Sequence, residues 1–141
     1  MEGWTCPRCG RLFARAGQGH DCAPGLSLEE YFATGPAHER PVFDAVLHHV
    51  EALGPVHADV VAAGIFLKNP RRFAELRPMT RWVAVSFRLP RQARHRTIVR
   101  KVVEHTPGRW WHTANVASPA DLDDALLELL TEAYVAAAGD G

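Results

Sequence analysis

Hydrophobic residues follow two different periods along the chain, and the change falls near Val56. Over residues 38–53 they recur every three or four positions, the spacing that places them on one face of an α-helix. We therefore predict a helix over residues 38–53 that ends at Gly54-Pro55. A shorter helix is predicted from Ser27, because Ser27 and Glu30 have the spacing of a capping box.

From Val56 onward, apolar and polar residues alternate with a period of two, which predicts β-strands. The clearest strand covers residues 82–89, where Val83, Val85, Phe87 and Leu89 share one face. Further strands are predicted over residues 64–68, 72–77, 98–105 and 109–116. Because no segment between them can hold a long crossover helix, an antiparallel meander is expected rather than a parallel sheet.

A last helix is predicted after the strands. Ser118 is expected to cap it, Pro119 fits its first turn, and an apolar stripe runs from Leu122 to Ala137. The predicted fold class is therefore α+β, with an antiparallel β-meander sheet packed against helices.

Length and composition agree with one compact domain and a small appendage. The chain has 141 residues, 47% of them hydrophobic, with 16 basic and 16 acidic residues and a formal net charge of zero. The longest apolar run, residues 60–67, is far shorter than the roughly 18–20 residues of a membrane-spanning helix. Since the first residues also lack the pattern of a signal peptide, we expect no membrane contact and a cytoplasmic location.

All three cysteines and one histidine lie near the N-terminus in a spacing typical of a metal site. Cys6 and Cys9 form a Cys-x2-Cys pair, and His20 and Cys22 follow ten residues later. Three thiolates and an imidazole favour Zn²⁺ in a closed tetrahedral, structural site, because about 20 residues cannot build a hydrophobic core of their own. A redox Cys-x2-Cys pair and free thiols are the alternatives.

The segment from Trp4 to Phe13 resembles the first half of a DNA-reading zinc finger. Its second half differs, because one residue separates His20 from Cys22, so the two side chains point about 200° apart on a regular helix. A DNA-reading helix is therefore not expected. We predict a CCHC-type zinc finger over residues 1–25 and an α+β domain over residues 26–141.

Residues of about 26–136 resemble an uncharacterised bacterial family, a domain of unknown function that occurs alone, behind such a finger, or appended to nuclease-like domains. The resemblance is carried by residues 27–32, Phe73-Ala74, Trp111-His112, and Asp121-Leu122-Asp123 leading to Tyr134. It implies the architecture and a link to nucleic acids, but it assigns no reaction.

Charge is distributed unevenly along the chain. Residues 67–111 hold ten arginines and two lysines against Glu75 and Glu104, whereas residues 112–141 hold six acids and no base. Arginines interleaved with aromatic residues are typical of surfaces that bind phosphates and stack bases. The candidate surface consists of Arg77, Arg81, Arg88, Arg100, Trp110, Trp111 and His112. In the alternative interpretation, the acidic last helix neutralises these bases internally.

No phosphate-binding loop, nucleophile elbow or dinucleotide motif occurs, so no catalytic residue is assigned. The sequence predicts a non-enzymatic, zinc-stabilised binding or adaptor module whose partner is a nucleic acid or another protein. The alternative is a small-molecule enzyme or anion-binding protein with a pocket near a hairpin that holds His105 and His112. In this interpretation, the two imidazoles supply the chemistry.

Overall fold

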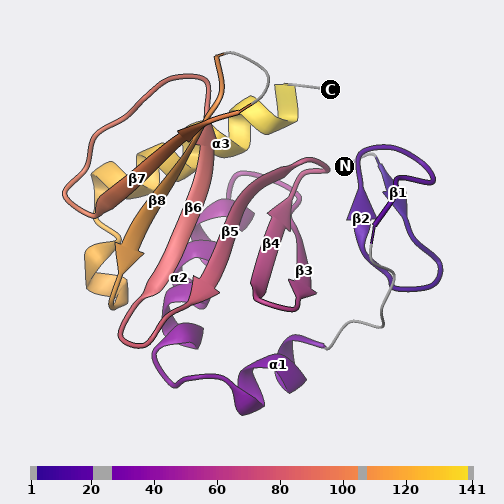
Figure 1. Cartoon of the computed structure of the whole chain (residues 1–141), viewed down its shortest axis with the longest axis horizontal. Helices are drawn as coiled ribbons and strands as arrows, with labels where there is room; N and C mark the ends of the chain where they lie inside the picture. The colour runs from indigo at the N-terminus through magenta and orange to yellow at the C-terminus, as the bar shows by residue number, and fades with distance from the viewer. Residues whose placement is uncertain (1–2, 21–26, 105–107, 140–141) are drawn as a thin grey trace.

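A computed structural model describes residues 3–20, 27–104 and 108–139. Its centre is one six-stranded sheet in the order β3-β4-β5-β6-β8-β7, and all neighbouring strands are antiparallel (Figure 1). This confirms the predicted antiparallel sheet and the α+β class. The strands are β3 (His57–Val61), β4 (Gly64–Lys68), β5 (Arg72–Pro78), β6 (Val83–Leu89), β7 (Ile98–Val103) and β8 (Trp110–Val116).

The sheet is a simple meander only from β3 to β6. After β6, the next strand in the sequence, β7, does not pair with β6. The following strand, β8, lies between β6 and β7 and pairs with both. This leaves β3 at one edge of the sheet and β7 at the other.

Two of the three helices begin and end close to the predicted positions. Helix α1 (Leu28–Thr34) has the expected capping box, since Ser27 Oγ accepts from the Glu30 amide at 3.1 Å and Glu30 Oε1 accepts from the Ser27 amide at 3.2 Å. Helix α2 (Glu39–Glu51) occupies the segment predicted from its apolar face.

Helix α3 (Asp124–Gly139) begins later than predicted. Ser118 makes no capping hydrogen bond, and residues Pro119–Asp121 form a separate 3₁₀ turn, η1. The carboxylate of Asp123 accepts from the Leu126 amide at 2.9 Å, which satisfies an amide of the first turn of α3. The cap is therefore an aspartate within the acidic cluster, and the serine before it is not used.

A buried acid connects α1 to α2. Glu39, the first residue of α2, has no exposed surface, and its Oε2 accepts from the Tyr31 hydroxyl at 2.5 Å. Burial raises the pKa of Glu39 above its ordinary range, because an apolar environment disfavours the charged carboxylate.

Helices α2 and α3 cover one face of the sheet, and the core lies between them (Figure 1). Val85 and Phe87 of β6 point to this face and are completely buried with Leu126 and Leu130 of α3. Side chains alternate along a strand, so the intervening residues of β6 point to the opposite face. No described element covers that opposite side in Figure 1, and we call it the open face.

The N-terminal residues form a separate small unit beside β3 and β4. Strands β1 (Trp4–Thr5) and β2 (Leu12–Phe13) pair as an antiparallel hairpin, and we call residues 3–20 the finger. Within the described residues, no helix has the length and apolar character needed to cross a membrane.

Candidate metal centre and adjoining basic cleft

Three of the four predicted metal ligands meet in the finger. The ligand atoms of Cys6, Cys9 and His20 all lie within 4.8 Å of one another, so this group could hold a metal ion. The turn between the two cysteines positions the thiols, because the Gly10 amide donates to the Cys6 carbonyl at 2.8 Å. Gly10 has φ of 75°, a left-handed conformation that favours glycine.

The ring of His20 is oriented for metal binding. Its Nδ1 lies 2.7 Å from the Gln18 carbonyl oxygen, which can only accept, so Nδ1 carries the proton. The other nitrogen, Nε2, lies 3.4 Å from Cys9 Sγ and presents its lone pair to the thiols. The Gln18 carbonyl raises the pKa of His20, because it favours a protonated ring nitrogen.

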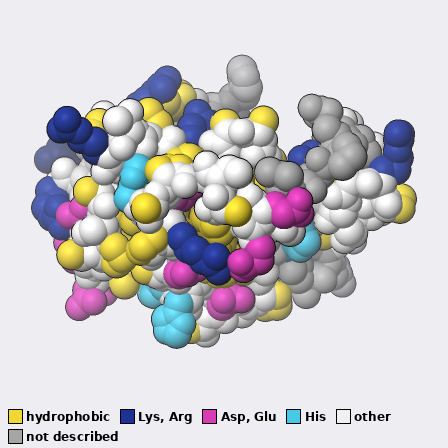
Figure 2. Space-filling model, turned by 90° about the horizontal axis from the view of Figure 1, so that it is seen from below, with side chains coloured by type: hydrophobic (Ala, Val, Ile, Leu, Met, Phe, Trp, Pro, Cys, Tyr) yellow, Lys and Arg dark blue, Asp and Glu magenta, His cyan; other side chains and the backbone are white. Residues whose placement is uncertain are grey.

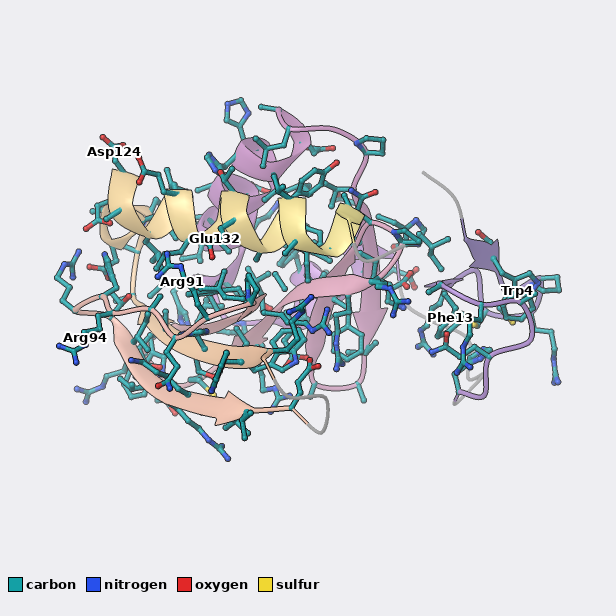
Figure 3. All side chains as sticks on the ribbon, turned by 90° about the horizontal axis from the view of Figure 1, so that it is seen from above. Trp4, Phe13, Arg91, Arg94, Asp124 and Glu132 are labelled. Atoms are coloured by element: carbon teal, nitrogen blue, oxygen red, sulfur yellow. The ribbon has the colours of Figure 1, made fainter. Side chains whose placement is uncertain are left out.

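Two aromatic rings of the finger pack beside the imidazole of His20. The rings of Phe13 and His20 lie 4.2 Å apart between centroids, and Trp4 lies 6.1 Å from Phe13 and 6.2 Å from His20 (Figure 3). Cys22, the predicted fourth ligand, lies outside the described residues.

The finger is attached to the sheet by a buried ion pair. Asp59 of β3 accepts from the Leu12 amide at 3.1 Å, and Lys68 of β4 donates to the Leu12 carbonyl at 2.6 Å. Asp59 and Lys68 lie 2.9 Å apart and are only 4% and 6% exposed. The Lys68 ammonium also lies 4.3 Å from the centre of the Phe13 ring. The backbone of β2 is therefore bound by two side chains of the sheet.

His57 completes this polar group. Its Nε2 lies 2.7 Å from Asp59 Oδ1, and both side chains point to one side of β3 because they are two residues apart on the strand. Burial alone would raise the pKa of Asp59, but hydrogen bonds from His57 and Lys68 outweigh burial and hold it below its ordinary value. Lys68 was not recognised as part of this group from the sequence, because it lies on a different strand.

A cleft of about 610 Å³ separates the finger from the open face of the sheet. Its lining includes five basic side chains and one acidic side chain. The bases are Arg15, Lys68, Arg71, Arg72 and Arg88, the acid is Glu104, and Phe66 and Trp111 are among the other residues of the lining. Three of these bases are ion-paired: Lys68 with Asp59, Arg72 with Glu75 at 3.6 Å, and Arg88 with Glu104. The cleft therefore keeps a smaller excess of positive charge, with aromatic rings in its wall.

Arg72 is held between two aromatic rings of this cleft. Its guanidinium carbon lies 4.6 Å from the centre of Phe66 and 5.1 Å from the centre of Trp111. Trp111 is itself fixed, because its indole N–H donates to Glu104 at 2.6 Å. Arg88 also binds Glu104 with two hydrogen bonds of 2.7 and 3.1 Å. Glu104 therefore neutralises Arg88 and orients Trp111.

The residues of the predicted surface do not all lie on one face. Trp111 is paired with Arg88 across β8 and β6, and both point to the open face. In the same way, Arg77 and Arg100 are paired with Ala84 and Thr113 on that face. Arg81 is exposed between β5 and β6.

Trp110 and His112 point to the helix side, because their partners Leu89 and Phe87 belong to the core. His112 is completely buried, stacks on Phe87 at 5.4 Å, and accepts from the Ala93 amide at 2.9 Å. Burial lowers the pKa of His112, so the ring is neutral near pH 7.

The prediction of a surface role for His112 therefore needs correction, because this side chain has no exposed surface. His105, the other histidine of the alternative pocket, lies outside the described residues.

The acidic end of the chain neutralises only part of the basic segment. Arg91 binds Glu132 of α3 at 2.8 Å, and Arg96 binds Asp121 at 3.3 Å. Figure 3 shows Arg91 and Glu132 pointing toward one another, whereas Arg94 points away from the protein. Within the described chain, ion pairs are absent at Arg77, Arg81, Arg94, Arg100 and Lys101. Basic side chains gather at the end of the molecule away from the finger (Figure 2).

Comparison with known proteins finds one family. A family model described as a domain of unknown function (DUF5655) matches residues 28–136, which begin at α1 and end within α3. The finger lies before the matched region. No curated protein and no solved structure matches the chain.

Proposed function

The chain belongs to the DUF5655 family of domains of unknown function, and from this premise we propose that it is a zinc-stabilised, non-enzymatic binding module whose ligand is single-stranded nucleic acid. The proposed binding site is the cleft between the finger and the open face. The proposed organisation is a CCHC zinc finger over residues 1–25 that is docked on an α+β domain over residues 26–141.

The donor set of the finger supports zinc as its metal. Thiolates and a neutral imidazole are the ligands that Zn²⁺ accepts in closed structural sites, and Cys22 would be the fourth. When protein atoms fill all coordination positions, no position is left for a substrate. The metal would therefore stabilise the fold of the finger and take no part in catalysis. Reduced thiols also fit a cytoplasmic location.

One observation carries the nucleic-acid proposal: Arg72 lies between Phe66 and Trp111 in a basic cleft. Single strands are bound where cationic side chains follow the phosphates and flat side chains stack with the bases. Arg15 on the finger and Arg71 beside β5 supply further charge on opposite sides of the cleft. A duplex has its bases stacked and paired, so it cannot use the aromatic wall in this way.

The test is fluorescence anisotropy with a short labelled oligonucleotide in single-stranded and duplex form, over about 50 to 200 mM salt. We expect the single strand to bind more tightly, with an affinity that falls as salt rises. The Arg72→Ala variant should lose about tenfold in affinity and lower the salt slope by roughly 0.7, because one phosphate contact and one stacking surface are removed.

The matched control is Arg94→Ala, which removes the same charge from a side chain that points away from the protein (Figure 3). This variant should bind like the wild type. Equal loss in both variants, or binding that does not depend on salt, would contradict the proposal. Displacement of the oligonucleotide by equimolar inorganic phosphate would instead indicate a small-anion site.

A further inference from the structure

Strand β7 exposes an apolar sheet edge. Six large hydrophobic residues are exposed among those that the structure describes, and three of them are on this strand: Val99 at 64%, Val102 at 43% and Val103 at 56%. Strand β7 pairs only with β8 and is the outermost strand in Figure 1. Exposed apolar edge strands are normally protected in native proteins, because their free amides and carbonyls can pair with another strand.

The other edge of the same sheet is protected. There the finger contacts β3, since Arg11 donates to the Val60 carbonyl at 3.3 Å and the Leu12 amide donates to Asp59. The contrast suggests that β7 is left open for a partner.

The free hydrogen-bonding groups of β7 can be assigned from its pairing. The Glu104 amide donates to the Arg109 carbonyl at 2.9 Å, so this residue faces β8. Amides alternate in direction along an antiparallel strand, so those of Lys101 and Val103 point away from β8. A further strand could therefore pair with these two residues.

The charges of β7 define what such a strand should contain. Arg100 and Val102 point to the open face, whereas Lys101 and Val103 point to the other side. Within the described residues, neither Arg100 nor Lys101 forms an ion pair. If a second copy of β7 paired antiparallel about Lys101, the two Lys101 side chains would lie opposite each other and repel, whereas two adjacent acids flanked by valines would complement both faces.

We propose that β7 is a docking strand for an extended acidic segment of another protein, which adds to the sheet as a seventh strand. The recognised pattern is two adjacent acidic residues with β-branched apolar residues on both sides. Backbone hydrogen bonds to Lys101 and Val103 supply affinity, and the charged pairs supply specificity. This proposal uses the strand edge and does not depend on the nucleic-acid cleft.

The test uses the full chain and two synthetic peptides, one with Val-Val-Glu-Glu-Val at its centre and one with Val-Val-Lys-Lys-Val. Binding is measured by fluorescence anisotropy, and the wild type should bind the Glu-Glu peptide at least about tenfold more tightly than the Lys-Lys peptide. The double variant Arg100→Glu/Lys101→Glu should reverse this preference. A third variant, Val103→Pro, keeps every charge but removes one outward amide, so it should weaken binding of the Glu-Glu peptide.

The matched control is Arg77→Glu/Arg81→Glu, which reverses two exposed charges away from β7 and should leave the preference unchanged. Thermal melting of each variant verifies its fold, and the exchange of preference cannot arise from unfolding. Equal binding of the two peptides, or the same loss in the control, overturns the proposal. Self-association through β7 that neither peptide inhibits, measured by sedimentation, would overturn it in favour of a dimer.

Discussion

Asp59 and Lys68 join the two parts of the chain. Both charges are almost completely buried, and each has a second partner in the backbone of Leu12. A buried charge is tolerated only when it is paired and hydrogen-bonded, because removal from water is unfavourable. The pair therefore depends on the finger, since the backbone of Leu12 supplies one further hydrogen bond to each charge, in addition to the bond from His57 to Asp59.

We expect Asp59→Asn to destabilise the protein by about 3–5 kcal/mol, because Lys68 then keeps a buried positive charge with no counter-ion. The double variant Asp59→Asn/Lys68→Met should be more stable than Asp59→Asn alone, since it removes that charge. Urea unfolding of the wild type, both single variants and the double variant measures the coupling free energy. Additive effects of the two substitutions would show that the pair is not coupled.

At the scale of elements, sequence patterns predicted what is local. The capping box of α1 and the alternation of β6 depend on residues a few positions apart, and the structure confirms both. The predicted start of α3 was wrong. Ser118 and Asp123 are both residue types that cap helices, and the 3₁₀ turn η1 after Ser118 delays the helix so that Asp123 is the residue that caps it. Four metal ligands are predicted from local spacing, and three of them, Cys6, Cys9 and His20, form a group that could hold a metal ion.

If the proposed zinc site is correct, the finger is the element whose stability depends on metal. Metal analysis of purified protein should find about one zinc per chain. Cys6→Ser and Cys9→Ser should each abolish it, and Cys22→Ser should weaken it if Cys22 is the fourth ligand. Helices α2 and α3 should keep their far-UV circular dichroism in these variants, because their core contains no residue of the finger.

The control for this experiment is Trp4→Phe, which alters the aromatic packing of the finger but none of its ligands. This variant should retain zinc. A metal-free wild type with thiols that react rapidly with Ellman's reagent would contradict a structural zinc site.

At the scale of the whole molecule, a net charge of zero conceals two different basic regions. Acids near and within α3 neutralise Arg91 and Arg96, as the self-neutralisation interpretation anticipated. On the open face, Arg77 and Arg100 form no ion pair with another described residue, as the binding interpretation requires. Sequence could not separate these groups, because strand register and the burial of His112 depend on contacts between distant segments.

With the proposed zinc bound, the position of Arg15 makes nucleic-acid binding in the cleft depend on the metal. Arg15 lies on the finger, whereas Arg71 and Arg72 belong to the sheet side, so the cleft has two basic walls only when the finger is folded and docked. Chelation of the zinc should therefore weaken binding of single-stranded nucleic acid by about tenfold at low salt, and addition of zinc should restore it.

Anisotropy before chelation, after it, and after zinc is returned measures this effect, with zinc content determined at each step. The Arg15→Ala variant provides the matched comparison, because it removes the positive charge on the finger side of the cleft and leaves the metal ligands of the finger in place. If loss of Arg15 is the main consequence of undocking, chelation should weaken this variant less than the wild type. An affinity that stays constant while the zinc is removed would show that the finger takes no part in binding.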